Sequence, residues 1–252
     1  MPARVVAVVG YKSSGKTRVI EGLVRELTSR GHRVGTLKHA TPHHLLDTPG
    51  RDTWRHREAG AEASAVIADG RAALFLDRPL TVAEALEILG PLDLVILEGF
   101  KSLDYIPRIL LPRSPGELEE LSNGLEIAVV APQLLEGGEV EASLLGLDEV
   151  EELASLVEAR ALPLLPGLNC GRCGHESCRE LAKAILMGEA DASGCVYLWA
   201  GDVELLVDGR RVPLNPYVRG VFRGVLQGLI NTLKGCEGIR RIEVRLEVEG
   251  DG

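Results

Sequence analysis

Eight residues near the start of the chain constrain its fold more than any others: Gly10-Tyr-Lys-Ser-Ser-Gly-Lys16-Thr17. They match G-x-x-x-x-G-K-[S/T], the P-loop pattern, in which backbone N–H groups and a lysine hold nucleotide phosphates. The apolar run Val5–Val9 predicts a buried strand before the motif, and apolar residues at helical spacing predict a helix after it. The motif therefore lies at a strand-to-helix turn, where a helix N-terminus favours an anion. The alternative is a glycine-rich turn whose lysine is only solvated.

The P-loop pattern assigns a role to each of its polar residues. We expect Lys16 to reach the β- and γ-phosphates and the Thr17 hydroxyl to hold Mg²⁺. Backbone amides of residues 13–17 are expected to face the phosphates. The predicted nucleotide-binding residues are Gly10, Ser13, Ser14, Gly15, Lys16 and Thr17.

Apolar patterns along the rest of the N-terminal part alternate between strands and helices. Strands are predicted at 32–37, 92–101, 106–111 and 125–131, and helices at 17–30, 81–89 and 147–160. This alternation predicts an α/β fold of the P-loop NTPase type, with a mostly parallel sheet covered by helices on both faces. Ligands of such sheets bind at the carboxyl ends of the strands, and Gly10, Lys38 and Glu98 all fall at such ends.

Local signals add three further expectations. Thr53 is expected to cap a short helix that runs to about Ala59, and Thr81 to begin an amphipathic helix. That helix should carry Val82, Ala85, Leu86 and Leu89 on one face. Asp69-Gly70 between two apolar runs predicts a hairpin of strands 63–68 and 72–76.

A triphosphate site also needs acidic residues, because phosphoryl transfer depends on Mg²⁺ and charge neutralisation beside the lysine. Glu98 ends a buried strand and fits this role better than Asp93, which begins it and suits a cap or an ion pair equally well. Asp47 and Asp52 are further candidates, with turn formation as the alternative for each. The predicted catalytic residues are Lys16, Asp52 and Glu98, and the predicted Mg²⁺ ligands are Thr17, Asp47 and Glu98.

The segment between residues 38 and 57 concentrates histidines and arginines. His39, His43 and His44 lack a secure zinc spacing, and neutral histidine also hydrogen-bonds phosphate. Arginines 51, 55 and 57 form a basic island that suits a second phosphate-bearing ligand. Ion pairing on a helix surface, with Glu58 and Glu62, is the alternative.

Four of the five cysteines form a second strong pattern: Cys170-x₂-Cys173-x₄-Cys178-x₁₆-Cys195. Four thiolates complete a tetrahedral site that admits Zn²⁺ or an iron–sulfur cluster. The short loops with interleaved glycines favour a [4Fe–4S] cluster over Zn²⁺. Cys236 stands apart and is expected to be an ordinary thiol.

Charge and hydropathy exclude several classes of protein. The net charge of −9 argues against generic nucleic-acid binding. No stretch approaches the roughly 18 apolar residues of a membrane span, and no secretory signal precedes the P-loop. A soluble, cytoplasmic protein is expected, in which clustered cysteines indicate a metal site.

The chain divides into three predicted domains: residues 1–160 with the P-loop, 161–198 with the four cysteines, and a small α+β module at 199–252. The last comprises a hairpin of strands 203–207 and 210–214, a helix at 216–234 and a strand at 239–248.

Several motifs of residues 1–160, in order, resemble the MobB family, molybdopterin-guanine dinucleotide biosynthesis protein B. They are the P-loop, Val34–His39 with His43-His44, the segment Asp47–Ala61 that contains Asp52, and Leu94–Lys101 that contains Glu98. The resemblance implies a GTP-binding P-loop protein with weak GTPase activity, usually a homodimer. It also implies as partners a MobA-like nucleotidyltransferase and the apoproteins of molybdo- or tungsto-enzymes.

Residues 163–196 resemble a different family, the small [4Fe–4S] domain of corrinoid iron–sulfur proteins and electron-transport subunits. This resemblance strengthens the iron–sulfur interpretation over zinc. The chain lacks an Asn-Lys-x-Asp guanine signature, so the preference for GTP rests on the MobB resemblance. Residues 131–133 (Ala-Pro-Gln) are a candidate base-contacting loop.

The function predicted from sequence is a GTP-binding accessory protein for molybdenum-cofactor guanine dinucleotide biosynthesis or delivery, fused to an iron–sulfur segment. One alternative is a nucleotide-gated adaptor without useful turnover. The other is a P-loop ATPase of iron–sulfur assembly or redox chemistry.

Overall fold

The computed structural model describes residues 3–40, 46–130 and 142–198, and further residues 203, 205–207, 210–212, 216–234, 242 and 244. The chain divides into two compact units, residues 1–195 and 196–252, which are treated separately. Some predicted features lie outside the described residues: His43, His44, the loop at 131–133, Cys236 and nearly all of the strand at 239–248.

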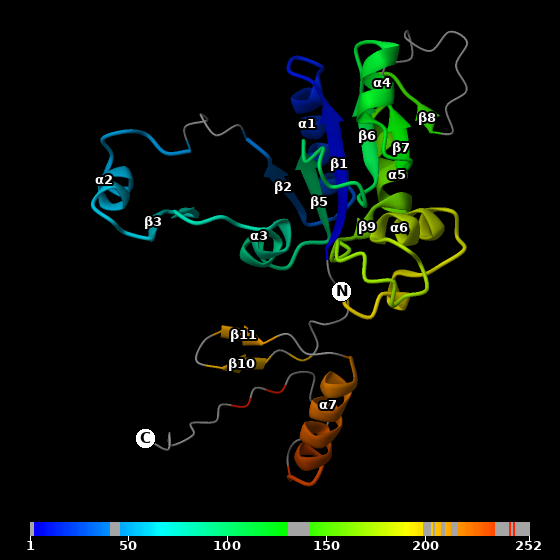
Figure 1. Ribbon diagram of the computed structural model, residues 1–252. Coiled ribbons are helices and arrows are strands. Elements are labelled where there is room, and N and C mark those ends of the chain that lie inside the picture. The colour runs from blue at the N-terminus through cyan, green and yellow to red at the C-terminus, as the bar shows by residue number, and fades with distance from the viewer. Residues whose placement is uncertain are drawn as a thin grey trace. The chain divides into compact units, whose positions relative to one another are not determined.

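A seven-stranded sheet forms the centre of the first unit (Figure 1). Its order is β2-β5-β1-β6-β7-β8, with every neighbouring pair parallel, while β9 pairs antiparallel with the start of β1. The mostly parallel α/β sheet predicted from sequence is thus confirmed. The strands are β1 (Arg4–Gly10), β2 (Val34–Lys38), β5 (Leu94–Glu98), β6 (Arg108–Leu111), β7 (Glu126–Val129), β8 (Ser143–Leu144) and β9 (Leu162–Pro163).

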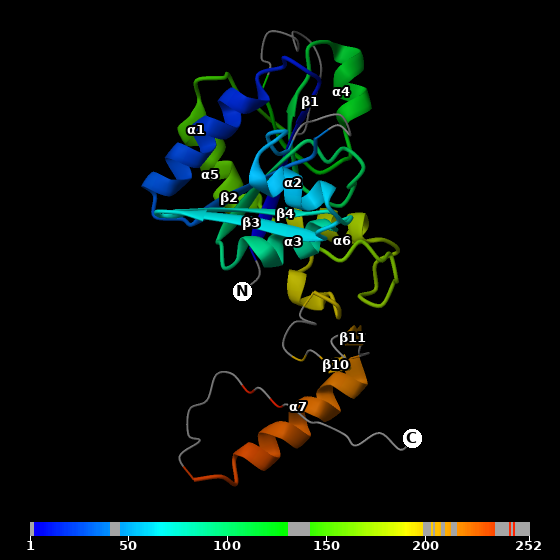
Figure 2. The ribbon, with the colours of Figure 1, turned by 90° about the vertical axis from the view of Figure 1, so that its left-hand side faces the viewer.

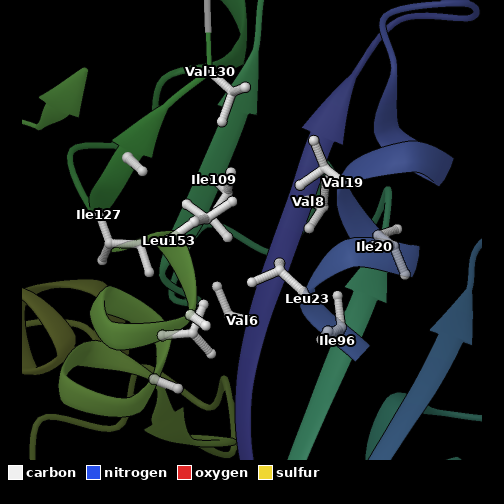
Figure 3. Packing of buried hydrophobic residues seen from close by; sticks show 14 of the residues in the cluster. Val6, Val8, Val19, Ile20, Leu23, Ile96, Ile109, Ile127, Val130 and Leu153 are labelled. Carbon is white, nitrogen blue, oxygen red and sulfur yellow. The ribbon is translucent and has the colours of Figure 1, made fainter. Parts of the chain in front are cut away.

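Helices cover both faces of this sheet because successive side chains of a strand point to opposite faces. On one face, Val6 and Val8 pack against the buried residues of α1 (Lys16–Ser29) and α5 (Val150–Arg160), as Figure 3 shows. On the other face, Val5, Ala7 and Val9 belong to a second core cluster, which α3 (Val82–Leu89) and α4 (Pro115–Leu121) join. The central strand is therefore buried on both sides, as a continuous apolar run requires.

The helix predicted to begin at Thr81 is confirmed, and Thr81 is its cap residue. The Thr81 hydroxyl accepts a hydrogen bond from the Glu84 backbone N–H, and the Glu84 carboxylate accepts from the Thr81 N–H. The hydrogen bonds that the Glu84 carboxylate accepts from the Thr81 N–H, the Thr81 hydroxyl and Arg78 lower its pKa to about 2. The predicted apolar face is only partly covered, since Val82 and Leu86 pack on the core while Leu89 is 42% exposed.

An arm of one helix and one hairpin connects β2 to α3. The hairpin predicted at Asp69-Gly70 is confirmed, with β3 (Ala63–Ala68) and β4 (Arg71–Leu76) pairing antiparallel in a separate sheet. Figure 2 shows it as a long ribbon beside α2 (Asp52–Glu58). The prediction that Thr53 caps α2 is wrong. The cap position is Arg51, in extended conformation and without a side-chain cap, so Thr53 lies inside the first turn.

The cysteine segment lies in the same compact unit as the sheet. It contains α6 (Cys178–Leu186) and a 3₁₀ turn at Ala192–Gly194, and Leu165 and Leu181 are buried. Ser177 caps α6 by accepting a hydrogen bond from the Glu180 N–H. The division of the chain at residue 160 stays a prediction, since β9 follows it directly and joins the central sheet.

In the second unit, β10 (Leu205–Val207) pairs antiparallel with β11 (Arg210–Val212), and α7 spans Pro216–Ile230. The hairpin and the helix were both predicted from the sequence. Within the described ranges, none of the helices combines the length and hydropathy that a bilayer crossing requires.

Candidate nucleotide site and cysteine segment

The P-loop connects the end of β1 to the start of α1, at the carboxyl edge of the sheet (Figure 1). Gly15 precedes the helix with φ 94°, and Ser13 has φ 65°, so both lie in the left-handed region. Such a backbone turns successive N–H groups towards one point, which is the arrangement that binds phosphate at a helix N-terminus. The loop therefore has the local form that the sequence pattern predicts.

Gly10 is required by close packing. A Cβ atom added there would lie 2.4 Å from the Ser14 Oγ and 2.8 Å from the Leu111 backbone oxygen. Gly10 and Leu111 are register partners in β1 and β6, so the carbonyl is fixed by the sheet. The absence of a side chain at Gly10 thus allows Ser14 of the loop and Leu111 of β6 to pack close to the end of β1.

Among the described residues of the loop, two carry polar groups that suit a bound anion. The Ser14 Oγ is buried without a hydrogen-bond partner. The Lys16 Nζ donates to the backbone oxygens of the loop itself, at 2.9 Å to Gly10 and 2.5 Å to Tyr11. An unpaired buried hydroxyl costs free energy, and an ammonium on carbonyls can exchange them for a stronger, charged acceptor. The residues present therefore fit a phosphate group.

The electrostatic environment of Lys16 also favours an anion. Burial lowers the pKa of Lys16, and the neighbouring cations Lys101, Lys38 and Arg113 lower it further, while Glu98 opposes them. Like charges held together destabilise one another unless a negative group lies between them. Three further cations therefore act on Lys16, against one carboxylate, Glu98.

Glu98 lies beside the P-loop, as its position in the sequence predicts. It is the register partner of Val8 in β1 and of Lys38 in β2. The Lys38 Nζ forms an ion pair with the Glu98 Oε1 at 2.9 Å, and the Glu98 side chain is 18% exposed. The structure therefore brings together the three strand ends predicted to converge, those carrying Gly10, Lys38 and Glu98.

The other acidic candidates have neighbours in the arm. Asp47 accepts a hydrogen bond from the Thr48 N–H at 2.7 Å and pairs with Arg57 at 3.5 Å. Asp52 is exposed in the first turn of α2. Within the described ranges, no hydrogen bond or ion pair joins either aspartate to the P-loop. Their roles in Mg²⁺ binding and catalysis stay predictions.

Asp93, for which a cap or an ion pair was the alternative to metal binding, forms an ion pair. Its carboxylate binds Arg33 at 2.8 Å (Nη2 to Oδ1) and 3.2 Å (Nε to Oδ2) and accepts the Arg33 backbone N–H. The hydrogen bonds from Arg33 hold the pKa of Asp93 well below its usual range. It precedes β5, at the edge of the sheet opposite the P-loop.

The basic island is partly neutralised within the arm. Arg57 pairs with Asp77 at 2.8 Å and lies over the Phe75 ring, 5.6 Å from its centroid. Its partners are thus Asp77 and Asp47, and ion pairs with Glu58 or Glu62, the predicted alternative, are absent among the described contacts. Nearer the P-loop, the His39 ring contacts the Phe100 ring, with centroids 5.3 Å apart.

Sequence reasoning missed a cluster around Tyr11. The Lys101 Nζ lies 3.4 Å from the centroid of the Tyr11 ring, and the Arg113 guanidinium lies 5.6 Å from it on a cation–π contact. The Tyr11 hydroxyl donates to Glu120 of α4, and this hydrogen bond raises the pKa of Tyr11. The sequence offered one signal for this cluster, namely an aromatic residue, Tyr11, inside the P-loop.

Arg108 was also missed, although it is a lone charge in an apolar strand. It is 3% exposed, and burial lowers its pKa. Its guanidinium donates to the backbone oxygens of Leu121 and Lys101, both at 2.6 Å, and of Leu103 at 3.1 Å. A buried arginine therefore fixes the loop that follows Glu98.

The cysteine segment is folded by its glycine and asparagine residues. Gly171 and Gly174 have positive φ and close a turn, with the Gly174 N–H donating to the Gly171 oxygen. Asn169, also at positive φ, accepts the Cys178 N–H at 2.8 Å. Gly167 contacts Tyr105, whose hydroxyl would lie 2.8 Å from an added Cβ. The loop is thus anchored to both α6 and the segment after β5.

The four thiols differ in exposure. Cys178 and Cys195 are buried, Cys173 is half-buried and Cys170 is exposed. Across the part of the chain that the structure describes, no three His, Cys, Asp or Glu side chains are gathered as ligands of one metal ion. The donor chemistry fits a four-thiolate group, whereas the present arrangement of the thiols does not assemble one.

The parallel sheet, the P-loop on its central strand and Glu98 on the neighbouring strand define a P-loop α/β protein. Residues 5–132 match the family described as "Molybdopterin guanine dinucleotide synthesis protein B". This chain belongs to that family, MobB. Residues 165–197 match a second family, described as "Putative Fe-S cluster".

Individual relatives extend the comparison. The chain is 30% identical over 247 residues to the "Putative molybdopterin-guanine dinucleotide biosynthesis adapter protein" of Methanocaldococcus jannaschii, covering 97% of this chain and 98% of that protein. It is 32% identical to the corresponding adapter protein of Haemophilus influenzae, over 61% of this chain and 86% of that one. The crystal structure of Bacillus subtilis MobB matches with a TM-score of 0.54 and 27% identity, covering 63% of this chain and 98% of that chain. The likeness to the Methanocaldococcus jannaschii protein thus extends over the cysteine segment and the C-terminal module.

Proposed function

We propose that this protein is a GTP-binding adapter, with weak GTPase activity, in the biosynthesis or delivery of the guanine dinucleotide form of molybdenum cofactor. Membership of the MobB family and the names of its relatives support the accessory role. The partners we propose are a MobA-like nucleotidyltransferase and the apoproteins of molybdo- or tungsto-enzymes.

The P-loop carries the nucleotide part of the proposal. Its left-handed turn, the Ser14 hydroxyl, which has no partner among the described residues, and the Lys16 ammonium support phosphate binding. Lys16→Ala is expected to abolish GTP binding while the protein stays folded. The test compares equilibrium binding of GTP and ATP with unfolding in urea for both proteins. Equal GTP affinity of the variant would refute the assignment.

Glu98 and Thr17 are the proposed Mg²⁺ ligands nearest the loop, with Asp47 and Asp52 as further candidates. When bound, Mg²⁺ supplies charge neutralisation for the phosphates. Glu98 suits this role because its oxygens lie at the carboxyl end of β5, next to the strand that leads into the P-loop. Its ion pair with Lys38 holds the carboxylate at this strand end.

Turnover decides between the proposed weak GTPase and an adaptor that uses GTP only to select a conformation. The rate of GTP hydrolysis is measured with and without a purified MobA-like nucleotidyltransferase. We expect a slow rate that rises with the partner. A rate that stays negligible with the partner favours the adaptor without turnover.

We further propose that Cys170, Cys173, Cys178 and Cys195 hold a [4Fe–4S] cluster. The match of residues 165–197 and the glycine-rich turn around Cys173 support this. Anaerobic purification followed by iron, sulfide and zinc analysis tests the proposal. About four iron atoms per chain are expected. Zinc without iron, with all four thiols reduced, would contradict it.

A homodimer is the oligomeric state that we propose. The β3–β4 hairpin supports it because Val66, Ile67 and Leu74 are 47%, 84% and 51% exposed. A two-stranded ribbon is at best marginally stable alone, and exposed apolar side chains on it favour a protein partner.

A further inference from the structure

Four cations surround the P-loop, and three of them have strong acceptors in the described structure. Lys16 donates to two backbone oxygens, Lys38 pairs with Glu98 at 2.9 Å, and Arg113 pairs with Glu117 at 2.5 Å. The fourth is Lys101.

Among the described residues, Lys101 contacts an aromatic face, and Glu117, the acid whose pKa it helps to lower, is already paired with Arg113. Its Nζ lies 3.4 Å from the Tyr11 ring centroid, and it forms no ion pair with any described residue. The interaction of an exposed ammonium with a ring is weaker than a charge-assisted hydrogen bond to phosphate. Lys101 is therefore the cation of this group that gains most from an incoming anion.

The backbone that carries Lys101 is held in place by buried groups. Arg108 donates to the backbone oxygens of Lys101 and Leu103. The buried Asn123 donates from its Nδ2 to the backbone oxygens of Asp104 and Ile106, both at 3.0 Å. The side chain of Lys101 can therefore change its partner while its Cα stays fixed.

The position of Lys101 also relates it to one end of the nucleotide. It lies three residues after Glu98, the proposed Mg²⁺ ligand, and it touches Tyr11, the second residue of the P-loop. Lys16, which the motif assigns to the β- and γ-phosphates, donates to the backbone oxygen of the same tyrosine. Two ammonium groups thus flank Tyr11, one at its backbone and one at its ring.

We propose that Lys101 is a second phosphate-binding lysine, which leaves the Tyr11 ring to contact the terminal phosphate of a nucleoside triphosphate. This inference rests on the proposed nucleotide function. A diphosphate lacks the group that Lys101 would bind, so the residue distinguishes triphosphate from diphosphate.

The test measures dissociation constants of GTP and GDP for the full chain and for Lys101→Met. Loss of one charge-assisted contact should weaken GTP binding about tenfold or more and GDP binding less than about threefold. Lys101→Arg should retain most of the GTP affinity, because it keeps the charge. ATP and ADP are measured in the same way, so the outcome does not depend on base preference.

Lys183→Met is the matched control, since it removes the same charge from an exposed position on α6. It should leave both affinities unchanged. Unaltered GTP affinity of Lys101→Met, or equal losses for GTP and GDP, would overturn the inference and leave the P-loop assignment intact. If the unmodified chain binds no nucleotide, both the proposed function and this inference fail.

Discussion

A single methyl group at Gly10 should damage both the stability and the ligand site of this protein. In Gly10→Ala the new Cβ would lie 2.8 Å from the Leu111 backbone oxygen and 2.4 Å from the Ser14 Oγ. The Ser14 hydroxyl can rotate away, but the Leu111 carbonyl belongs to β6, which pairs with β1 in the sheet. Relief therefore requires movement of the strand end or of the P-loop. Overpacking of this kind costs about 1–3 kcal/mol.

Urea denaturation of Gly10→Ala measures the loss in the free energy of unfolding, and GTP titration measures the loss of affinity. Gly116→Ala in the first turn of α4 is the matched control, because an added Cβ there meets nothing within 4 Å. Alanine favours a helix over glycine, so this control should be neutral or more stable by up to about 1 kcal/mol. If Gly10→Ala unfolds at the same urea concentration as the unmodified protein and binds GTP equally well, the steric argument is refuted.

Three further predictions concern other parts of the molecule. Thr81→Ala should lower the free energy of unfolding by about 1 kcal/mol at pH 7 through loss of the cap of α3. Because folding lowers the pKa of Glu84 to about 2, its contribution is present above the unfolded value of 4.5 and is lost as the pH falls towards 2. Urea unfolding between pH 7 and pH 3 should therefore show a smaller acid loss in Thr81→Ala than in the unmodified protein, and an equal loss would contradict this. Ile67→Lys should convert the proposed dimer to a monomer in light scattering, whereas an unchanged mass would exclude the hairpin as the interface. Glu98→Gln should reduce by about tenfold the gain in GTP affinity that Mg²⁺ provides, and the same gain in both proteins would remove Glu98 from the metal site.

The sequence predicts the central fold well because its signals are local and agree with one another. Val5–Val9 is apolar at every position, and the structure buries all five residues in a parallel sheet. The convergence of Gly10, Lys38 and Glu98 followed from strand direction alone, because each ends a parallel strand. The start of a helix at Thr81 was predicted correctly because apolar residues at helical spacing follow it directly, whereas its capping bond with Glu84 was not predicted.

Other features depend on contacts that a single sequence does not specify. Thr53 was a suitable cap by residue type, but α2 begins earlier, at Asp52. The contacts of Tyr11 and Arg108 join elements far apart in the chain, so neither role follows from local pattern. The sequence shows a single charged residue, Arg108, in the apolar run Ile106–Leu111. It does not show which backbone oxygens accept its hydrogen bonds.

The cysteine segment shows the same limit in another form. The spacing of its four thiols indicates a metal group, and turn geometry at Gly171 and Gly174 is consistent with the interleaved glycines. The described thiols are not gathered around one centre, so the cluster is proposed from their spacing and the family match.

The central claim is that Gly10–Thr17 forms a working nucleotide site. Calorimetric titration of GTP into the full chain, with Mg²⁺ present and ATP measured alongside, tests it most directly. We predict saturable binding with one site per chain, tighter for GTP than for ATP and absent in Lys16→Ala. The account is contradicted if no saturable binding of either nucleotide is seen, or if Lys16→Ala binds GTP as well as the unmodified protein does.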